Sequence, residues 1–187
     1  MRRQLPNLLT ILRILAIPLL AWLAVRDARG SFGLVLIACL LGDVADGALA
    51  RALDATSALG ALLDSLADTL LFFMTLFGVL VFYPEAVRGH GVAFAAVPAA
   101  WLAENVAALL RYGRLSSFHT YLSRLAAVAM GVFASVLFVW GFSAALLYAA
   151  ASLVLLATLE EFVLLWLLPR WTPDVKGIWW VLYRTWK

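Results

Sequence analysis

Four aspartates lie in a stretch of this chain that is otherwise apolar. Asp43 and Asp46 are three residues apart, and Asp64 and Asp68 are four apart, so each pair lies on one face of a helix. A short turn would make the two helices antiparallel neighbours, with the four carboxylates facing one another. Such anions repel each other and oppose membrane insertion. Because carboxylate oxygens are hard ligands, we expect one or two divalent cations, Mg²⁺, Mn²⁺ or Ca²⁺.

Other residues on the same faces fit a phosphate-containing ligand. Gly47 and Gly60 leave room for a bulky group near the backbone, and Arg51 can supply positive charge to a phosphate. Three other interpretations compete: glycines that only pack helices, an ion-pair network, and a cation or proton transporter. Arg51 alone cannot balance four aspartates, so an ion-pair network built on it is disfavoured.

The composition indicates an integral membrane protein. The chain has 187 residues, of which 65% are hydrophobic and 13% charged, whereas a soluble domain carries roughly 25% charged residues. The net charge of +3 is explained by basic residues that flank membrane spans. Because no arginine-rich patch alternates with exposed aromatic residues, we expect no nucleic-acid partner.

Apolar runs of about 20 residues predict an all-α fold with six transmembrane helices, in one membrane domain that covers residues 1–187. The predicted spans are residues 8–25, 32–52, 58–83, 92–111, 120–140 and 143–168. Turn-forming residues separate them, including a predicted break at 83–91. The tail 169–187 mixes Trp with Arg and Lys, which is typical of a segment at the membrane interface. The bias of basic residues predicts that both termini and the aspartates lie on the cytoplasmic side.

The segment from Asp43 to Asp68 resembles the signature of the CDP-alcohol phosphatidyltransferase family, D-x2-D-G-x2-A-R-x8-G-x3-D-x3-D. All the fixed positions are matched, by Asp43, Asp46, Gly47, Ala50, Arg51, Gly60, Asp64 and Asp68. The opening segment, PNLLTILRILAIPLL, is similar to that of bacterial phosphatidylglycerophosphate synthases. The resemblance implies a six-helix bundle in a bacterial-type inner (cell) membrane, and a homodimer.

The resemblance also implies a reaction in phospholipid biosynthesis. CDP-diacylglycerol gives its phosphatidyl group to an alcohol, and CMP leaves. By the same resemblance, Asp43, Asp46 and Asp64 bind the divalent metal, Mg²⁺ or Mn²⁺, and Asp68 shares that site or acts as general base. The CDP group would lie against Gly60 and against the signature residues of the first of the two helices, which are Asp43, Asp46, Gly47, Ala50 and Arg51.

Polar residues elsewhere extend this site. Asn7, Thr10 and Arg13 recur at every third position of the first predicted helix. They either line the donor pocket or satisfy one another.

A basic cluster near the cytoplasmic face is the candidate for binding an acceptor phosphate. It consists of Arg111, Arg114, His119 and Arg124. Arg111 and Arg114 fit equally well as positive-inside anchors, and His119 as a capping or packing residue. Arg124 lies within a predicted span and needs a partner, which is either the acceptor or one of Glu160 and Glu161.

We therefore expect an enzyme whose acceptor is glycerol 3-phosphate, with inositol phosphate, inositol or serine as alternatives. Outside this class, the alternative is a cation-coupled transporter. A transporter should show internal repeats and broken helices, and the sequence displays neither.

Overall fold

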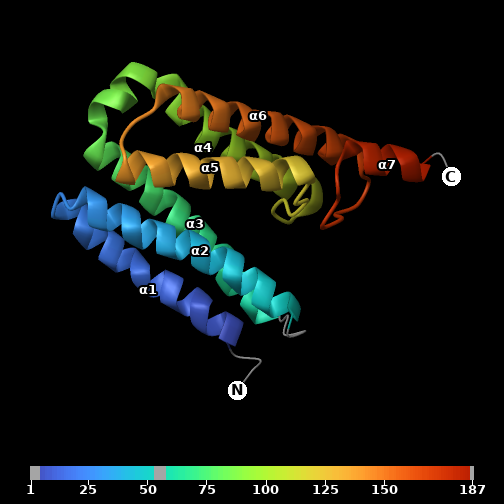
Figure 1. The fold of residues 1–187 in the computed structure, drawn as a ribbon. Coiled ribbons are helices and arrows are strands. Elements are labelled where there is room, and N and C mark those ends of the chain that lie inside the picture. Colours follow the sequence, from blue (N-terminus) through green and yellow to red (C-terminus); the bar gives the residue numbers. More distant parts are fainter. Residues whose placement is uncertain (1–4, 53–57, 186–187) are drawn as a thin grey trace. The chain divides into compact units, whose positions relative to one another are not determined.

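The computed structural model describes the backbone of residues 5–52 and 58–185 and, within these ranges, the side chains of residues 10–45, 60 and 62–183. All regular structure in these ranges is helical (Figure 1). The helices are α1 (Leu5–Val25), α2 (Arg29–Ala52), α3 (Ala58–Phe82), α4 (Pro84–Tyr112), α5 (Tyr121–Val139), α6 (Ala144–Leu167) and α7 (Ile178–Thr185).

The helices belong to two compact units. The first contains α1, α2 and α3, together with residues 134–142 at the end of α5. The second contains α4 from residue 89, the rest of α5, α6 and α7.

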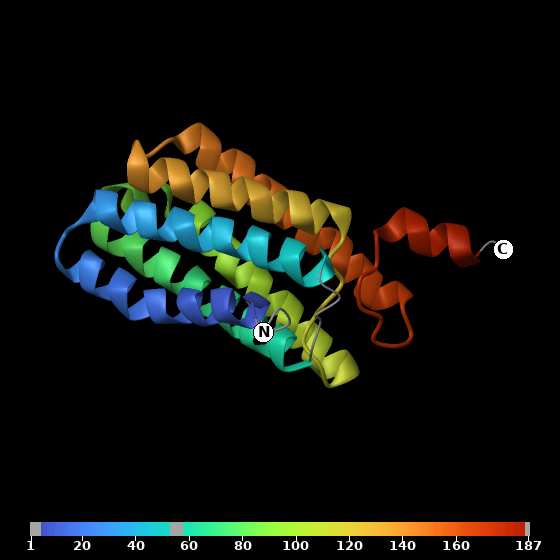
Figure 2. The same cartoon turned by 60° about the horizontal axis from the view of Figure 1, so that its bottom comes forward.

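In the first unit, α1 packs against both α2 and α3, whereas α2 and α3 contact each other much less. The three helices lie side by side in Figures 1 and 2, and α2 runs opposite to the other two. This arrangement places one face of α1 beside the aspartate-bearing segments of the other two helices.

The opposite end of the first unit is held by aromatic side chains against glycines. A Cβ atom at Gly33 would lie 2.9 Å from Phe138 Cβ, and one at Gly78 would lie 2.6 Å from Phe32 Cζ. Phe32 and Phe138 are both fully buried, with ring centroids 4.7 Å apart. The glycines therefore let the backbones come close enough for these rings to fill the interface.

In the second unit, α4 and α6 are joined near both ends of α4. His90 Nδ1 lies 3.0 Å from the Tyr148 hydroxyl oxygen, and the Tyr112 hydroxyl donates to the Leu168 carbonyl at 2.8 Å. Ser143 caps α6 by accepting a hydrogen bond from the Leu146 amide.

Helix α7 is held at its beginning by α6. The Ile178 amide donates to Glu160 Oε1 at 3.3 Å. A Cβ atom at Gly177 would lie 2.9 Å from the same oxygen, and the residue has φ +149°, so only glycine suits both the backbone and the space. Glu160 thus satisfies a free amide at the N-terminus of α7.

Each predicted span coincides with a helix, but the predicted break at residues 83–91 is only partly right, because within it only Tyr83 lies outside the helices. Helix α4 begins at Pro84, and His90, with φ −130° and ψ 28°, only kinks it. Proline at the first helical position and Glu85 in the first turn both favour a helix start here. The tail 169–187 also contains a helix that the sequence did not predict, α7.

The all-α membrane fold is confirmed for the described residues. Four of their helices are long and apolar enough to cross a membrane: Leu62–Phe82, Pro84–Tyr112, Tyr121–Val139 and Ala144–Leu167. The described apolar part of α1, Thr10–Val25, is shorter.

Candidate metal centre

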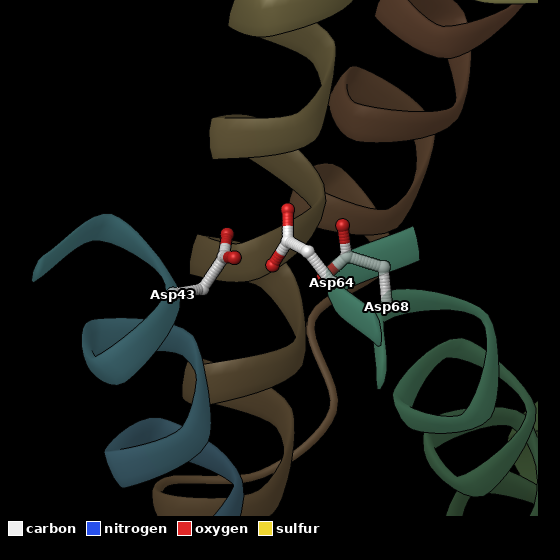
Figure 3. Close-up of side chains that lie close together, drawn as sticks. All are labelled: Asp43, Asp64 and Asp68. Carbon is white, nitrogen blue, oxygen red and sulfur yellow. The ribbon is translucent and has the colours of Figure 1, made fainter. Parts of the chain in front are cut away.

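Three of the four aspartates converge in the first unit. Asp43 lies on α2, and Asp64 and Asp68 lie one helical turn apart on α3. One carboxylate oxygen from each lies within 4.8 Å of the others. Figure 3 shows the three carboxyl groups gathered at the same place between the two helices.

The donor atoms suit a hard divalent cation. The side chains of Asp43, Asp64 and Asp68 remain 40%, 47% and 53% exposed, so part of each carboxyl group is accessible from outside the helices. Three carboxylates leave further coordination positions to water or to substrate phosphates, as Mg²⁺ usually requires. The cluster can therefore bind a divalent metal ion.

The side chain of Arg13 enters this cluster from α1. Its Nη1 atom lies 2.8 Å from Asp43 Oδ1 and 2.9 Å from Asp64 Oδ1, and its Nη2 atom pairs with Asp68 Oδ1. The side chain is only 5% exposed. The sequence interpretation weighed only Arg51 as a balancing positive charge and missed Arg13.

The reason for this error lies in the packing of α1. The sequence suggested that the aspartate faces of α2 and α3 lie directly against each other, but α1 packs against both, and Arg13 bridges them. A Cβ atom at Gly42 would lie 3.8 Å from Arg13 Cδ, so the arginine stem runs close to the α2 backbone. In the sequence, the signal for this role was that Arg13 is a charged residue inside an apolar helix.

The structure describes only some of the other residues that were predicted to bind the CDP-linked donor. Thr10 is buried on α1, and Gly60 lies on α3 with partial exposure. The other candidates for donor or metal binding have side chains outside the described residues: Asn7 on α1, and Asp46, Gly47, Ala50 and Arg51 on α2. Their roles stay predictions.

The candidate acceptor residues all belong to the second unit, and the structure gives most of them partners within the chain. Arg111 Nη2 donates to the carbonyls of Trp166 and Leu168 at 3.5 and 3.3 Å, at the end of α6. The Arg114 guanidinium lies 5.2 Å from the centre of the Trp171 ring. These contacts agree with an anchoring role, which the sequence left open.

Arg124 lies in the first turn of α5 and does not pair with the predicted glutamates. Its Nε donates to the His119 carbonyl at 3.1 Å, and its Nη2 lies 3.9 Å from Asp174 Oδ1. The side chain is 61% exposed, so it remains accessible to a ligand. His119, at φ +51°, supplies the carbonyl that accepts the Arg124 hydrogen bond, and its binding role stays a prediction.

Glu161 has a different environment from the one expected. The residue is 7% exposed, and its carboxyl group shares hydrogen bonds with Ser123 and with Glu104, which is 6% exposed. The sequence interpretation, which considered Glu160 and Glu161 only as partners of Arg124, missed Glu104. A carboxylate in the predicted span 92–111 was the available signal.

Comparisons with known proteins agree with the geometry of the first unit. The family model for CDP-alcohol phosphatidyltransferase matches residues 3–168. Cardiolipin synthase (CMP-forming) from Streptomyces coelicolor is 40% identical over 80 residues, which are 40% of this chain and 37% of that protein. The aligned region thus spans less than half of either chain. No solved structure matches the chain. Because the family match covers most of its length, the chain belongs to the CDP-alcohol phosphatidyltransferase family.

Proposed function

We propose that the protein transfers the phosphatidyl group of CDP-diacylglycerol to the hydroxyl of an alcohol and releases CMP. The observation that carries this proposal is the convergence of Asp43, Asp64 and Asp68, whose oxygens lie within 4.8 Å of one another. These residues occupy signature positions of the family to which the chain belongs. Family membership also favours this transfer over cation-coupled transport.

In the proposed reaction, the acceptor oxygen attacks the phosphorus that carries diacylglycerol. The bond from that phosphorus to the bridging oxygen breaks, and CMP leaves with the electron pair. When bound, Mg²⁺ or Mn²⁺, in one or two ions, would neutralise the diphosphate and stabilise the leaving CMP. Asp43, Asp46 and Asp64 would bind the metal. Asp68 takes the proton that the hydroxyl loses, or shares the metal site.

The donor side of the site is proposed to extend over α1 and α2. Asn7 and Thr10 from α1 and Arg51 from α2 would contact the CDP group, and Gly47 and Gly60 would let it approach the helices. The acyl chains stay in lipid, so the site must open to the membrane. We further propose six spans, with α1 and α2 also crossing the membrane, both termini and the site on the cytoplasmic side, and a homodimer.

For the acceptor, we propose the primary hydroxyl of a glycerol whose other end carries a phosphate. Glycerol 3-phosphate has such a hydroxyl, and the resemblance of the opening segment to phosphatidylglycerophosphate synthases supports it as the acceptor. Phosphatidylglycerol has it too, and a phosphatidyl transfer that yields cardiolipin, the product in the relative's name, requires that acceptor. Inositol phosphate, inositol and serine are the alternatives.

An acceptor screen tests the proposal. The purified full-length chain in lipid nanodiscs is mixed with CDP-diacylglycerol and Mn²⁺ or Mg²⁺, and each acceptor is added alone. CMP is measured by chromatography, and the lipid product by mass spectrometry. We expect acceptor-dependent CMP release with glycerol 3-phosphate or phosphatidylglycerol, and none from the Asp64→Asn variant. Folded protein that releases no CMP with any acceptor would overturn the proposal.

A further inference from the structure

Arg13, the buried arginine of the carboxylate cluster, lies outside the Asp43–Asp68 motif, so the family signature assigns it no role. We propose that Arg13 is the internal counter-ion of the metal centre: its guanidinium holds the carboxylates together when no metal is bound, and a divalent cation binds in competition with it. The inference rests on the metal centre of the proposed function and adds a residue that sets its metal affinity.

Arg13 contacts all three described carboxylates of the cluster. Nη1 lies 2.8 and 2.9 Å from the Oδ1 atoms of Asp43 and Asp64, and Nη2 pairs with Asp68 Oδ1. The guanidinium therefore points at one oxygen of each carboxylate in the cluster. An Mg²⁺ ion bound to the Asp43 and Asp64 oxygens at about 2.0–2.1 Å would compete with Nη1 for the same lone pairs.

Burial makes the guanidinium of Arg13 depend on the aspartates. The Arg13 side chain is 5% exposed, and its Nε atom is buried without a hydrogen-bond partner among the described side chains. A buried guanidinium is tolerated only where anions compensate it. The cluster in turn needs a cation, because the carboxylates on α2 and α3 would otherwise repel one another. Arginine and aspartates thus depend on each other in the metal-free protein.

The described charged groups of the cluster do not cancel one another. Three carboxylates and one guanidinium leave a formal charge of −2 among the described groups. The cluster therefore still attracts a divalent cation, but the guanidinium weakens that attraction at contact distances. Removing the positive charge should destabilise the metal-free protein and tighten metal binding.

The test compares Arg13→Gln with the wild-type protein in the same detergent. Mn²⁺ affinity is measured by electron paramagnetic resonance of free Mn²⁺, and the thermal midpoint is measured in chelator and in Mn²⁺. We expect the Mn²⁺ Kd of Arg13→Gln to be at least about tenfold lower than that of the wild type. We also expect a lower midpoint in chelator and a larger rise with Mn²⁺. An unchanged or higher Kd would overturn the inference.

Two control variants separate charge from shape. Arg13→Lys keeps the positive charge, so its Kd should stay within about threefold of the wild type. Arg29→Gln makes the same change at the other end of the unit, where Arg29 donates to the Tyr83 hydroxyl at 3.1 Å, and should leave Kd unchanged. Tightening by Arg13→Lys equal to that of Arg13→Gln would contradict a role of the charge.

Two further outcomes are decisive. If Arg13→Gln unfolds in chelator, the inference requires that Mn²⁺ restores folded protein, and a variant unfolded under both conditions contradicts it. If the wild type binds no Mn²⁺, or Asp64→Asn binds it equally well, the metal centre itself is wrong. That result would refute the proposed function rather than only the role of Arg13.

Discussion

The two ends of the first compact unit are packed in opposite ways, although α2 and α3 contribute to both. At one end Phe32 and Phe138 are fully buried against Gly33 and Gly78. At the other end three aspartates of α2 and α3 remain 40–53% exposed around one buried arginine. The buried aromatic side chains stabilise the helix packing. The neighbouring carboxylates are less favourable for stability, but they form a site that can bind a cation. Changes at the two ends should therefore have different effects.

The largest effect on activity is expected at the carboxylate end. Asp43→Asn and Asp64→Asn should each lower CMP release by at least about 10³-fold, because a metal clamp supplies several kcal/mol to the transition state. The thermal midpoint in chelator should change little, since Arg13 keeps two carboxylate partners. Rates and midpoints measured on the same preparations check both. A variant that retains wild-type CMP release would contradict the catalytic role given to the carboxylate end.

Asp68→Asn should have the next largest effect. As general base, Asp68 would contribute about 10²–10⁴-fold, so kcat should fall by at least about 10²-fold while the Kd values for metal and donor stay nearly unchanged. Single-turnover kinetics and Mn²⁺ binding check these values. If the affinity for metal falls as far as in Asp64→Asn, Asp68 is a metal ligand and not the base.

At the aromatic end, Gly78→Val should lower stability without changing metal affinity. The new Cβ would lie 2.6 Å from Phe32 Cζ, and such overpacking costs roughly 1–3 kcal/mol. For a chain of this size, the thermal midpoint should fall by about 2–12 °C. Gly30→Ala is the matched control, since no atom lies within 4 Å of the added carbon. Equal midpoints for both variants would refute the role given to this end.

The smallest effect is expected in the second unit. If Arg124 binds the acceptor phosphate, Arg124→Ala should raise the KM for glycerol 3-phosphate by about fivefold. The effect is small because the Arg124 side chain is 61% exposed, and water weakens its charged hydrogen bonds. The KM for CDP-diacylglycerol should stay the same. Arg88→Ala, which removes an exposed pair with Glu85, is the control. An unchanged acceptor KM would leave Arg124 as a partner of Asp174 only.

The sequence predicted the helices and the aspartate cluster, because both depend on local spacing. Apolar runs marked the helices near their observed bounds, and the intervals between Asp43, Asp64 and Asp68 fixed the faces of α2 and α3 that carry them. Most of the break expected at residues 83–91 is helical, because Pro84 can begin a helix as well as end one.

Contacts between distant helices could not be read from spacing. The pairing of Arg13 with the aspartates depends on α1 packing against both α2 and α3. The hydrogen bond between Glu104 and Glu161 joins α4 and α6, which are separated by a further helix in the chain. In both cases the sequence showed a charged residue inside an apolar helix but did not identify its partner.

The central claim is that the carboxylates of α2 and α3 bind the divalent metal on which phosphatidyl transfer depends. The most direct measurement is CMP release by the purified full-length chain with CDP-diacylglycerol and acceptor, first after removal of divalent metal with a chelator and then during titration with Mn²⁺ or Mg²⁺. We expect no CMP release above background in chelator, and recovery of release as the metal is added. Full CMP release in the presence of the chelator would contradict it.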